Sequence, residues 1–157
     1  AKRIAEMFRK NDWTLVYCGM GTGLAGDVAK ALLAKGGKVV AVVVSGKEPP
    51  DVPAAASREV VADFHERQRR LFDLGDAALV LPGGLGTLSE MAELGAWRSA
   101  GLYTNNLAVF DPDGWFDDLY KFLSGAERAK VLTGSLSNAL PRVSSLAEAK
   151  RTLTSPE

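Results

Sequence analysis

Four short runs of apolar, β-favouring residues divide the chain. They are Thr14–Cys18, Lys38–Val44, Ala77–Leu81 and Asn106–Phe110. The second run is apolar without interruption from Val39 to Val44, whereas a half-exposed strand would alternate apolar and polar residues. Unbroken apolar strands are typical of parallel sheets that are covered on both faces. The pattern therefore predicts a buried parallel sheet.

Helical patterns separate these runs, with apolar residues at the spacing of one helix face. The predicted helices are Ala1–Lys10, Leu24–Lys35, Ala54–Asp73, Leu88–Arg98 and Trp115–Ser124, followed by a short strand near Pro141–Ser144 and a helix at Ser145–Leu153. Alternating strands and helices predict an α/β fold. Because the sequence opens within a helix, we expect that a first strand precedes it and is missing here.

The first glycine-rich segment, Cys18–Gly26, follows a predicted strand and enters a predicted helix. Its glycines at 21, 23 and 26 formally match the dinucleotide fingerprint, but that fingerprint also needs an acidic residue at the end of the next strand. That strand ends in Val43-Val44-Ser45-Gly46. Two interpretations stay open, namely a phosphate or nucleotide site at a helix N-terminus and a tight turn that needs positive φ.

The second glycine-rich segment, Leu81–Glu90, is the most specific part of the chain. It has no Gly-Lys-Ser/Thr ending, so it is not an ATP-binding loop. Its glycines free backbone N–H groups at a helix N-terminus, which suits an anion. Thr87 can bond a phosphate or cap the helix. Glu90 either completes a capping box with Thr87 or acts on a ligand by holding a sugar hydroxyl or activating water.

The predicted helix Ala54–Asp73 carries an arginine on its apolar stripe. The apolar members of the stripe are Val60, Val61, Phe64, Leu71 and Phe72. Arg67 falls on the same face, so it needs a carboxylate, carbonyl groups or an anionic ligand. We expect His65 to be a partly exposed hydrogen-bonding residue, and Glu66 to pair with Arg70 four residues later.

The remaining candidate residues favour structural roles. We expect the tryptophans at 13, 97 and 115 to serve packing or an interface, and Asp111–Gly114 to form a turn. An apolar face around Leu94, Trp97 and Leu102 is typical either of a dimer contact or of packing against the sheet.

Composition argues against several further classes of protein. The 157 residues suggest one domain spanning 1–157, and 19 basic against 19 acidic residues argue against a nucleic-acid binder. Cys18 is the one cysteine and His65 the one histidine, so neither an internal disulfide nor a structural metal site is expected. No apolar run reaches the roughly 18 residues of a membrane span. We expect a cytoplasmic protein without a cofactor.

Several motifs together resemble the LOG ("lonely guy") family, the cytokinin-activating phosphoribohydrolases once described as possible lysine decarboxylases. Pro82–Glu90 matches P-G-G-x-G-T-x-x-E, and His65-Glu66-Arg67 resembles the core of M-H-E-R-K. Tyr17–Gly26 resembles Y-G-G-G-x-x-G-L-M-G, and Asp113-Gly114 matches the V-D-G-Y-Y turn. The sequence departs from the family at Cys18, Met20, Ala25, Phe64, Gln68, Ala96 and Ser99.

The resemblance implies a Rossmann-like parallel sheet flanked by helices, apparently lacking the first strand, and a homodimer with sites near the subunit interface. It implies hydrolysis of the N-glycosidic bond of a nucleoside 5′-monophosphate, which releases an adenine-type base and ribose 5-phosphate. Arg67 and Glu90 match the family's catalytic pair. The expected phosphate- and substrate-binding residues are Gly83, Gly84, Gly86, Thr87, Gly21 and Gly23.

Relatives in the wider superfamily leave other functions open. They include AMP-hydrolysing enzymes and a molybdenum cofactor carrier, which binds without turnover, and a catalytically silent homologue is a further alternative. Retention of both Arg67 and Glu90 favours an enzyme. Lysine decarboxylation needs a Schiff-base lysine for its cofactor, and neither glycine-rich segment contains a lysine.

Overall fold

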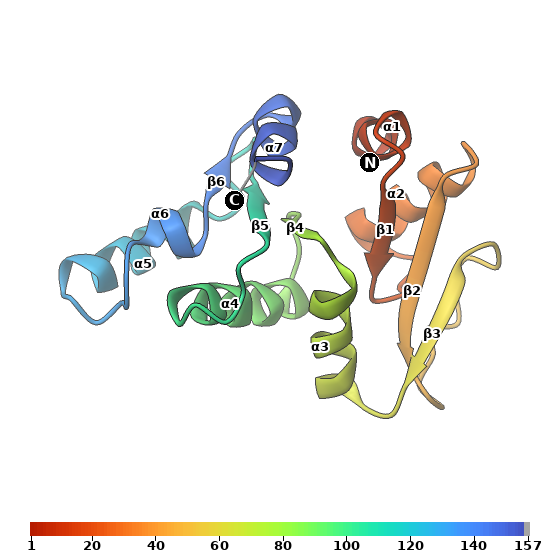
Figure 1. Cartoon of the computed structure of the whole chain (residues 1–157), viewed down its shortest axis with the longest axis horizontal. Coiled ribbons are helices and arrows are strands. Elements are labelled where there is room, and N and C mark those ends of the chain that lie inside the picture. The colour runs from red at the N-terminus through yellow and green to blue at the C-terminus, as the bar shows by residue number, and fades with distance from the viewer. Residues whose placement is uncertain (156–157) are drawn as a thin grey trace. The chain divides into compact units, whose positions relative to one another are not determined.

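The computed structural model describes residues 1–155 and separates the chain into two compact units, Ala1–Gly75 and Asp76–Glu157. Each unit has its own parallel sheet of three strands with helices packed against it (Figure 1). This is the predicted α/β class, and it is consistent with a Rossmann-like fold. The single-domain organisation stays a prediction.

In the first unit, helices and strands alternate except that the last two strands follow one another directly. Its elements are α1 (Lys2–Lys10), β1 (Thr14–Tyr17), α2 (Gly23–Leu33), β2 (Lys38–Val44), β3 (Ser57–Val61) and α3 (Phe64–Leu74). The strands lie in the order β1-β2-β3, with β2 in the centre. Both pairings are parallel, and Val16 lies opposite Val40 while Val44 lies opposite Val61.

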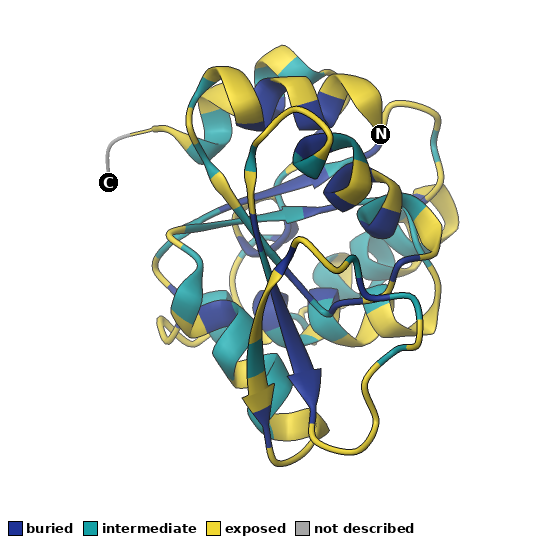
Figure 2. Cartoon of the chain, turned by 90° about the vertical axis from the view of Figure 1, so that its right-hand side faces the viewer, coloured by how far each residue is buried: buried dark blue, intermediate teal, exposed yellow. Residues whose placement is uncertain are grey.

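The core of this unit is built around β2. Side chains alternate between the two faces of a strand, and β2 is buried on both, because α2 and α3 each pack on it. One cluster contains Val42, Val44 and Val61, packed with Val16 of β1 and with Leu71 and Leu74 of α3. Figure 2 shows β2 in dark blue beside the mostly exposed β3. The uninterrupted apolar run is therefore explained, as predicted, by the burial of β2 on both faces of the sheet.

The predicted helix at Ala54–Asp73 is wrong in its first half. Ser57–Val61 forms β3 along β2, and the helix is confined to Phe64–Leu74. On the strand, Val61 points into the core and Val60 is 58% exposed, so the helical stripe included residues that share no helix. Asp63 begins α3, because its carboxylate accepts the N–H groups of residues 65 and 66.

In the second unit, strands and helices alternate except for one pair of consecutive helices. Its elements are β4 (Ala77–Val80), α4 (Leu85–Ser99), β5 (Asn106–Phe110), α5 (Asp117–Arg128), α6 (Leu136–Ala139), β6 (Arg142–Val143) and α7 (Leu146–Leu153). The strand order is β4-β5-β6, and both pairings are parallel. Helix α7 packs on this sheet through a small cluster of Ala108, Val143 and Ala149. Ser145 and Glu148 form a capping box at the start of α7.

Two helix starts in this unit differ from the prediction. Helix α4 begins at Leu85 and not at Leu88. Helix α5 begins at Asp117 and not at Trp115, because the carboxylate of Asp111 accepts the N–H groups of Trp115 and Phe116 and holds both residues in the preceding loop.

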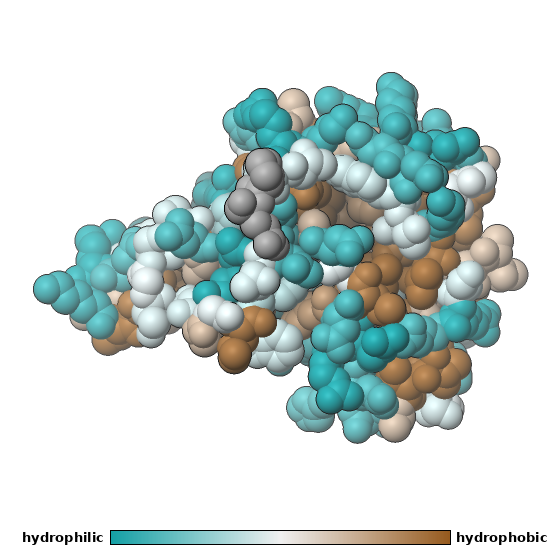
Figure 3. Space-filling model, in the orientation of Figure 1, coloured by the Kyte–Doolittle hydropathy of each residue, from teal (hydrophilic) through white to brown (hydrophobic). Residues whose placement is uncertain are grey.

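Apolar side chains remain exposed on the first unit. Figure 3 shows brown, hydrophobic atoms over the region where Figure 1 draws β2 and β3. Val60 and Phe64 are among the large apolar side chains exposed in this unit. Within residues 1–155, every helix is either too short or too polar to cross a lipid bilayer.

Candidate active site

The second glycine-rich loop joins β4 to α4. Gly84 is the N-cap residue of α4, so Thr87 lies within the first turn and Glu90 in the second. The capping-box interpretation of Thr87 and Glu90 is therefore wrong, because the helix begins three residues earlier than that motif requires. Thr87 and Glu90 are neighbours at i and i+3 on one side of the helix.

The start of α4 offers backbone N–H groups. The N–H of Leu88 donates to the carbonyl of Gly84 at 3.0 Å, which closes the first turn. The N–H groups of the preceding helical residues, 85–87, have no acceptor within the helix, and Gly84 has no side chain to cap them. Such a helix end favours an anion through both hydrogen bonding and the helix dipole.

Open space surrounds two glycines of this loop. Apart from chain neighbours and the backbone of the helix itself, a Cβ atom added to Gly84 or Gly86 would meet no atom of residues 1–155 within 4 Å. Neither residue has a positive φ. The chain's own packing and backbone geometry therefore do not require glycine here, whereas close approach of a ligand to the backbone would.

Residue 83 has to be glycine because the side chain of Thr87 lies against it. A Cβ atom there would lie 2.1 Å from Oγ1 and 2.9 Å from Cβ of Thr87. The side chain of Thr87 thus folds over the backbone of Gly83, and its hydroxyl lies at the loop. Glu90 follows three residues later on the same side of α4, so the side chains of Thr87 and Glu90 start from one face of the helix.

Arg67 lies half-buried on α3 in the first unit. Its guanidinium carbon is 4.9 Å from the centroid of the Phe64 ring, and Lys47 Nζ is 5.7 Å from the same centroid. Arg67 Nε is buried and finds no hydrogen-bond partner among the described residues. The predicted need for an acceptor is thus unmet at this atom. Because Glu90 belongs to the other unit, the pairing of Arg67 with Glu90 stays a prediction.

The neighbours of Arg67 differ from the expected pattern. His65 is exposed. Glu66 does not pair with Arg70, because its carboxylate accepts the N–H of Ala62 at 2.7 Å and Arg70 pairs with Glu59 instead. Glu66 therefore helps to begin α3, and it has a structural role that needs no ligand.

The first glycine-rich loop is shaped by the unit's own packing. A Cβ atom at Gly21 would lie 2.0 Å from the backbone oxygen of Asp51 and 2.8 Å from its carboxylate carbon. Gly19 and Gly23 adopt φ values of +82° and +74°, which favour glycine. Gly21 and Gly23 thus have structural reasons to be glycine, and the carboxylate of Asp51 beside Gly21 disfavours a phosphate at that point. Their role in binding substrate stays a prediction.

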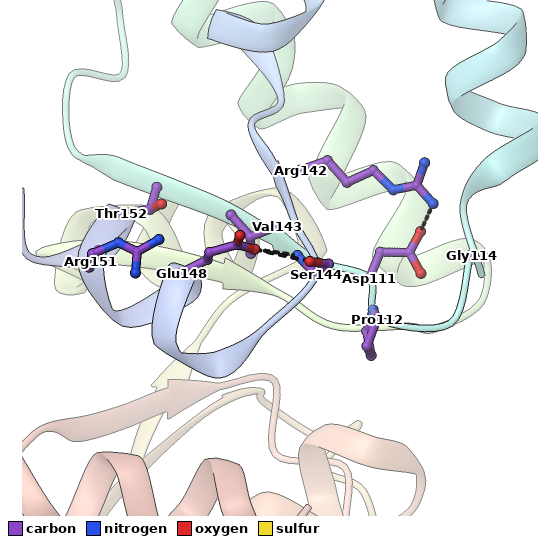
Figure 4. A pocket seen from close by; sticks show the side chains of 9 residues that line it. All are labelled: Asp111, Pro112, Gly114, Arg142, Val143, Ser144, Glu148, Arg151 and Thr152. Atoms are coloured by element: carbon purple, nitrogen blue, oxygen red, sulfur yellow. Dashed lines mark hydrogen bonds and ion pairs between the residues drawn. The ribbon is translucent and has the colours of Figure 1, made fainter.

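A pocket of about 480 Å³ lies at the carboxyl ends of β5 and β6. Figure 4 shows Asp111 and Arg142 pointing toward one another on its wall, 2.7 Å apart. Burial alone would raise the pKa of Asp111. The backbone N–H groups of Phe116 and Trp115 and the guanidinium of Arg142 outweigh burial and hold that pKa below its usual value. Asp111 is therefore a charged, buried anchor for the loop after β5.

Trp115 connects that loop to the second glycine-rich loop. Its indole N–H donates to the carbonyl oxygen of Gly83 at 3.0 Å, although 64% of the residue is exposed. Sequence reasoning missed this contact and that of Lys47 with Phe64, because neither partner is close in sequence. In residues 1–155 we find no cluster of His, Cys, Asp and Glu side chains suited to a metal ion.

The profile of one protein family matches most of the chain. The family is described as "Possible lysine decarboxylase", and the match covers residues 25–153. The chain belongs to this family. This is the LOG family that the sequence motifs indicated, and the matched region contains Arg67, Glu90 and the whole second glycine-rich loop, while it begins after Gly23 of the first loop.

Plant members of the LOG family are similar to the chain. A probable cytokinin riboside 5′-monophosphate phosphoribohydrolase from Oryza sativa subsp. japonica is 37% identical over 71% of this chain and 50% of its own length. A cytokinin riboside 5′-monophosphate phosphoribohydrolase from Arabidopsis thaliana is 32% identical over 71% of this chain and 54% of its own. The chain thus spans about half the length of the curated relatives it matches.

Proposed function

We propose that this LOG family member hydrolyses the N-glycosidic bond of a nucleoside 5′-monophosphate, releasing an adenine-type base and ribose 5-phosphate. One observation carries the proposal, namely the open backbone of Gly84 and Gly86 at the uncapped start of α4, with Glu90 one turn further on. Both rice and Arabidopsis relatives are named as enzymes of this reaction.

The 5′-phosphate binds at the second glycine-rich loop. The free N–H groups at the start of α4, together with the Thr87 hydroxyl, form an anion site of hydrogen-bond donors that needs no lysine. Gly84 and Gly86 allow the phosphate oxygens to approach the backbone, because no side chain fills the space above them. Gly83 and Thr87 fix the shape of the loop by their mutual contact.

Glu90 acts on the ribose. Cleavage of a glycosidic bond passes through a state in which the sugar carries positive charge at C1′. The Glu90 carboxylate stabilises that charge and orients a water molecule, which adds its hydroxide to C1′ while the base leaves with the bonding electrons and takes up a proton. Arg67, whose Nε has no hydrogen-bond partner among residues 1–155, positions Glu90 or stabilises the charge on the departing base.

We further propose a cytokinin-type nucleotide, with a substituent on the adenine N6 atom, as the preferred substrate. The support is the activity for which the plant relatives are named. The other chemistry that the family description suggests is lysine decarboxylation, and the absence of lysine from both glycine-rich loops disfavours it.

A cytoplasmic homodimer completes the proposal. The predicted dimer face loses one member, because Leu94 is buried within the chain. Leu102 is 74% exposed, and Trp97 on α4 is half-buried. Sedimentation of the full-length protein at micromolar concentration tests the dimer, and a monomer alone would contradict a site shared between two copies.

The proposed reaction is tested by following free base. The full-length protein is incubated with AMP and with isopentenyladenosine monophosphate, and the released base is measured by chromatography. Glu90→Gln should lower kcat by about 100-fold or more with a nearly unchanged melting temperature, because glutamine keeps the size of the side chain and can still form hydrogen bonds. Glu93→Gln, the same change one turn along α4, is the matched control.

The outcomes separate the candidate functions. Base release that is lost in Glu90→Gln and kept in Glu93→Gln supports the hydrolase. Release from AMP alone would indicate an AMP-specific nucleosidase. No release, while a nucleotide or a pterin-bearing ligand still protects the protein against heat, would overturn the hydrolase in favour of a carrier.

A further inference from the structure

Trp115 has an unusual environment for a tryptophan. It is 64% exposed, so burial does not explain its position, yet its indole N–H is bonded to a backbone carbonyl 32 residues away. The acceptor is Gly83, in the loop to which we assign the phosphate. The bond therefore joins the loop after β5 to the proposed binding site.

The loop that carries Trp115 is itself firmly held. Asp111 Oδ1 accepts the N–H of Trp115 at 2.7 Å, and Oδ2 accepts the N–H of Phe116 at 3.0 Å. Phe116 is 2% exposed and anchors the loop in the core. Arg142 neutralises the buried carboxylate from the neighbouring strand β6. The backbone of Trp115 is thus held in place, and this restricts the positions that its indole N–H can take.

The bond to Gly83 determines the direction of one N–H group in the phosphate loop. The carbonyl of Gly83 and the N–H of Gly84 belong to one planar peptide unit, and in the trans form they point in opposite directions. A peptide between two glycines rotates easily, because neither side has a Cβ atom to restrict it. Fixing the carbonyl on Trp115 therefore fixes the Gly84 N–H on the opposite side.

We propose that Trp115 is a positioning residue, whose indole N–H holds the Gly83–Gly84 peptide so that the Gly84 N–H is directed to the 5′-phosphate. This inference rests on the proposed function. Gly84 and Gly86 supply space at the cost of flexibility, and Trp115 restores order from outside the loop. Trp115 acts through the loop and touches no reacting atom.

The test removes the indole N–H in two ways. Trp115→Phe keeps an aromatic ring but loses both the donor and the second ring, whereas the isosteric variant in which benzothienylalanine replaces Trp115 loses the donor alone. Both should weaken binding of ribose 5-phosphate and raise KM for the nucleoside monophosphate by about threefold to tenfold, as expected for one hydrogen bond. Affinity for ribose, kcat and the melting temperature should stay close to wild type. Phe122→Leu, another exposed aromatic residue changed in the same unit, is the control.

The results distinguish this inference from the proposed function. If wild-type protein releases base and both variants keep wild-type KM and ribose 5-phosphate affinity, Trp115 has no positioning role. If Trp115→Phe weakens binding and the benzothienylalanine variant does not, the ring contributes and the hydrogen bond does not, which also overturns the proposal. If wild-type protein releases no base, the proposed function fails. The affinity of the two variants for ribose 5-phosphate then decides the role of Trp115, and wild-type affinity in both would overturn it.

Discussion

The two glycine-rich loops of this chain look alike in sequence and differ in what surrounds them. In the first loop, Gly21 lies against the backbone of Asp51 and Gly23 has a positive φ. In the second, Gly84 and Gly86 face open space without positive φ. A glycine that its own fold requires gives no information about a ligand. One that the fold does not require points to something that approaches from outside.

The loops also differ in how they are held. The first is fixed by close packing of the Asp51 segment upon it. The second is held by a donor from another loop, Trp115, which in turn depends on Asp111. Because Gly84 and Gly86 leave space for a ligand, the contact of Gly83 with Thr87 orders only part of this loop, and a neighbouring segment supplies the rest.

The largest expected effect lies in the first loop. Gly21→Ala places a methyl group 2.0 Å from the backbone oxygen of Asp51, which cannot swing away as a side chain could. The free energy of unfolding should fall by about 3 kcal/mol, at the upper end of overpacking costs. Chemical denaturation measures it. Unchanged stability together with lost nucleotide binding would reverse the roles of the two loops.

A somewhat smaller loss is expected from Asp111→Asn. The amide keeps one acceptor oxygen for two backbone N–H groups and removes the charge beside Arg142, which retains its ion pair with Asp117. The free energy of unfolding should fall by about 2 kcal/mol, and affinity for ribose 5-phosphate should fall with it. Asp113→Asn, an exposed residue in the same turn, should change neither. Full retention of ligand affinity would show that the second loop needs no external support.

Gly86→Ala should separate stability from binding. Because the added methyl group meets no atom within 4 Å and the residue lies in the first turn of α4, stability should rise by up to about 1 kcal/mol. Ribose 5-phosphate should bind more weakly, since the methyl group enters the space assigned to phosphate. A thermal melt with and without this ligand measures both effects, and a loss of stability would show that the glycine has a structural cause.

The smallest expected effect is the loss at low pH of the stability that the Asp111 carboxylate contributes. The pKa of Asp111 is lowered in the folded protein, whereas in the unfolded chain an aspartate titrates near about 3.9. Its stabilising contribution is therefore complete above that value and is lost as pH falls through the folded pKa. The stability gap between wild type and Asp111→Asn should narrow below about pH 4. A gap that stays constant down to pH 2.5 would contradict the lowered pKa.

Elements defined by their own residues could be predicted from the sequence. Strands β2 and β5 match their predicted bounds, because unbroken apolar runs identify buried strands. Strand β3 could not be found, since only pairing with β2 makes Ser57–Val61 extended and Val60 stays exposed. The start of α4 was misplaced because Thr87 and Glu90 imitate a capping box that the helix does not use.

The features of the candidate site also divide into those visible in the sequence and those that only the fold creates. The motif Pro82–Glu90 and the arginine on the apolar stripe were visible from residue types and spacing. The supporting contacts were not, because Trp115 bonds a carbonyl 32 residues away and Lys47 reaches the ring of Phe64 from a separate loop. Sequence spacing predicts neighbours along one helix or strand, and it does not predict which loops meet at the carboxyl ends of parallel strands.

The most direct test of the central claim is the affinity of Gly84→Ala for ribose 5-phosphate, measured by calorimetry on the full-length protein with ribose as the comparison ligand. We expect the dissociation constant for ribose 5-phosphate to rise by about tenfold or more, equivalent to about 1.4 kcal/mol, with ribose binding and the melting temperature unchanged. Wild-type affinity in this variant would contradict the claim that the second glycine-rich loop holds the phosphate.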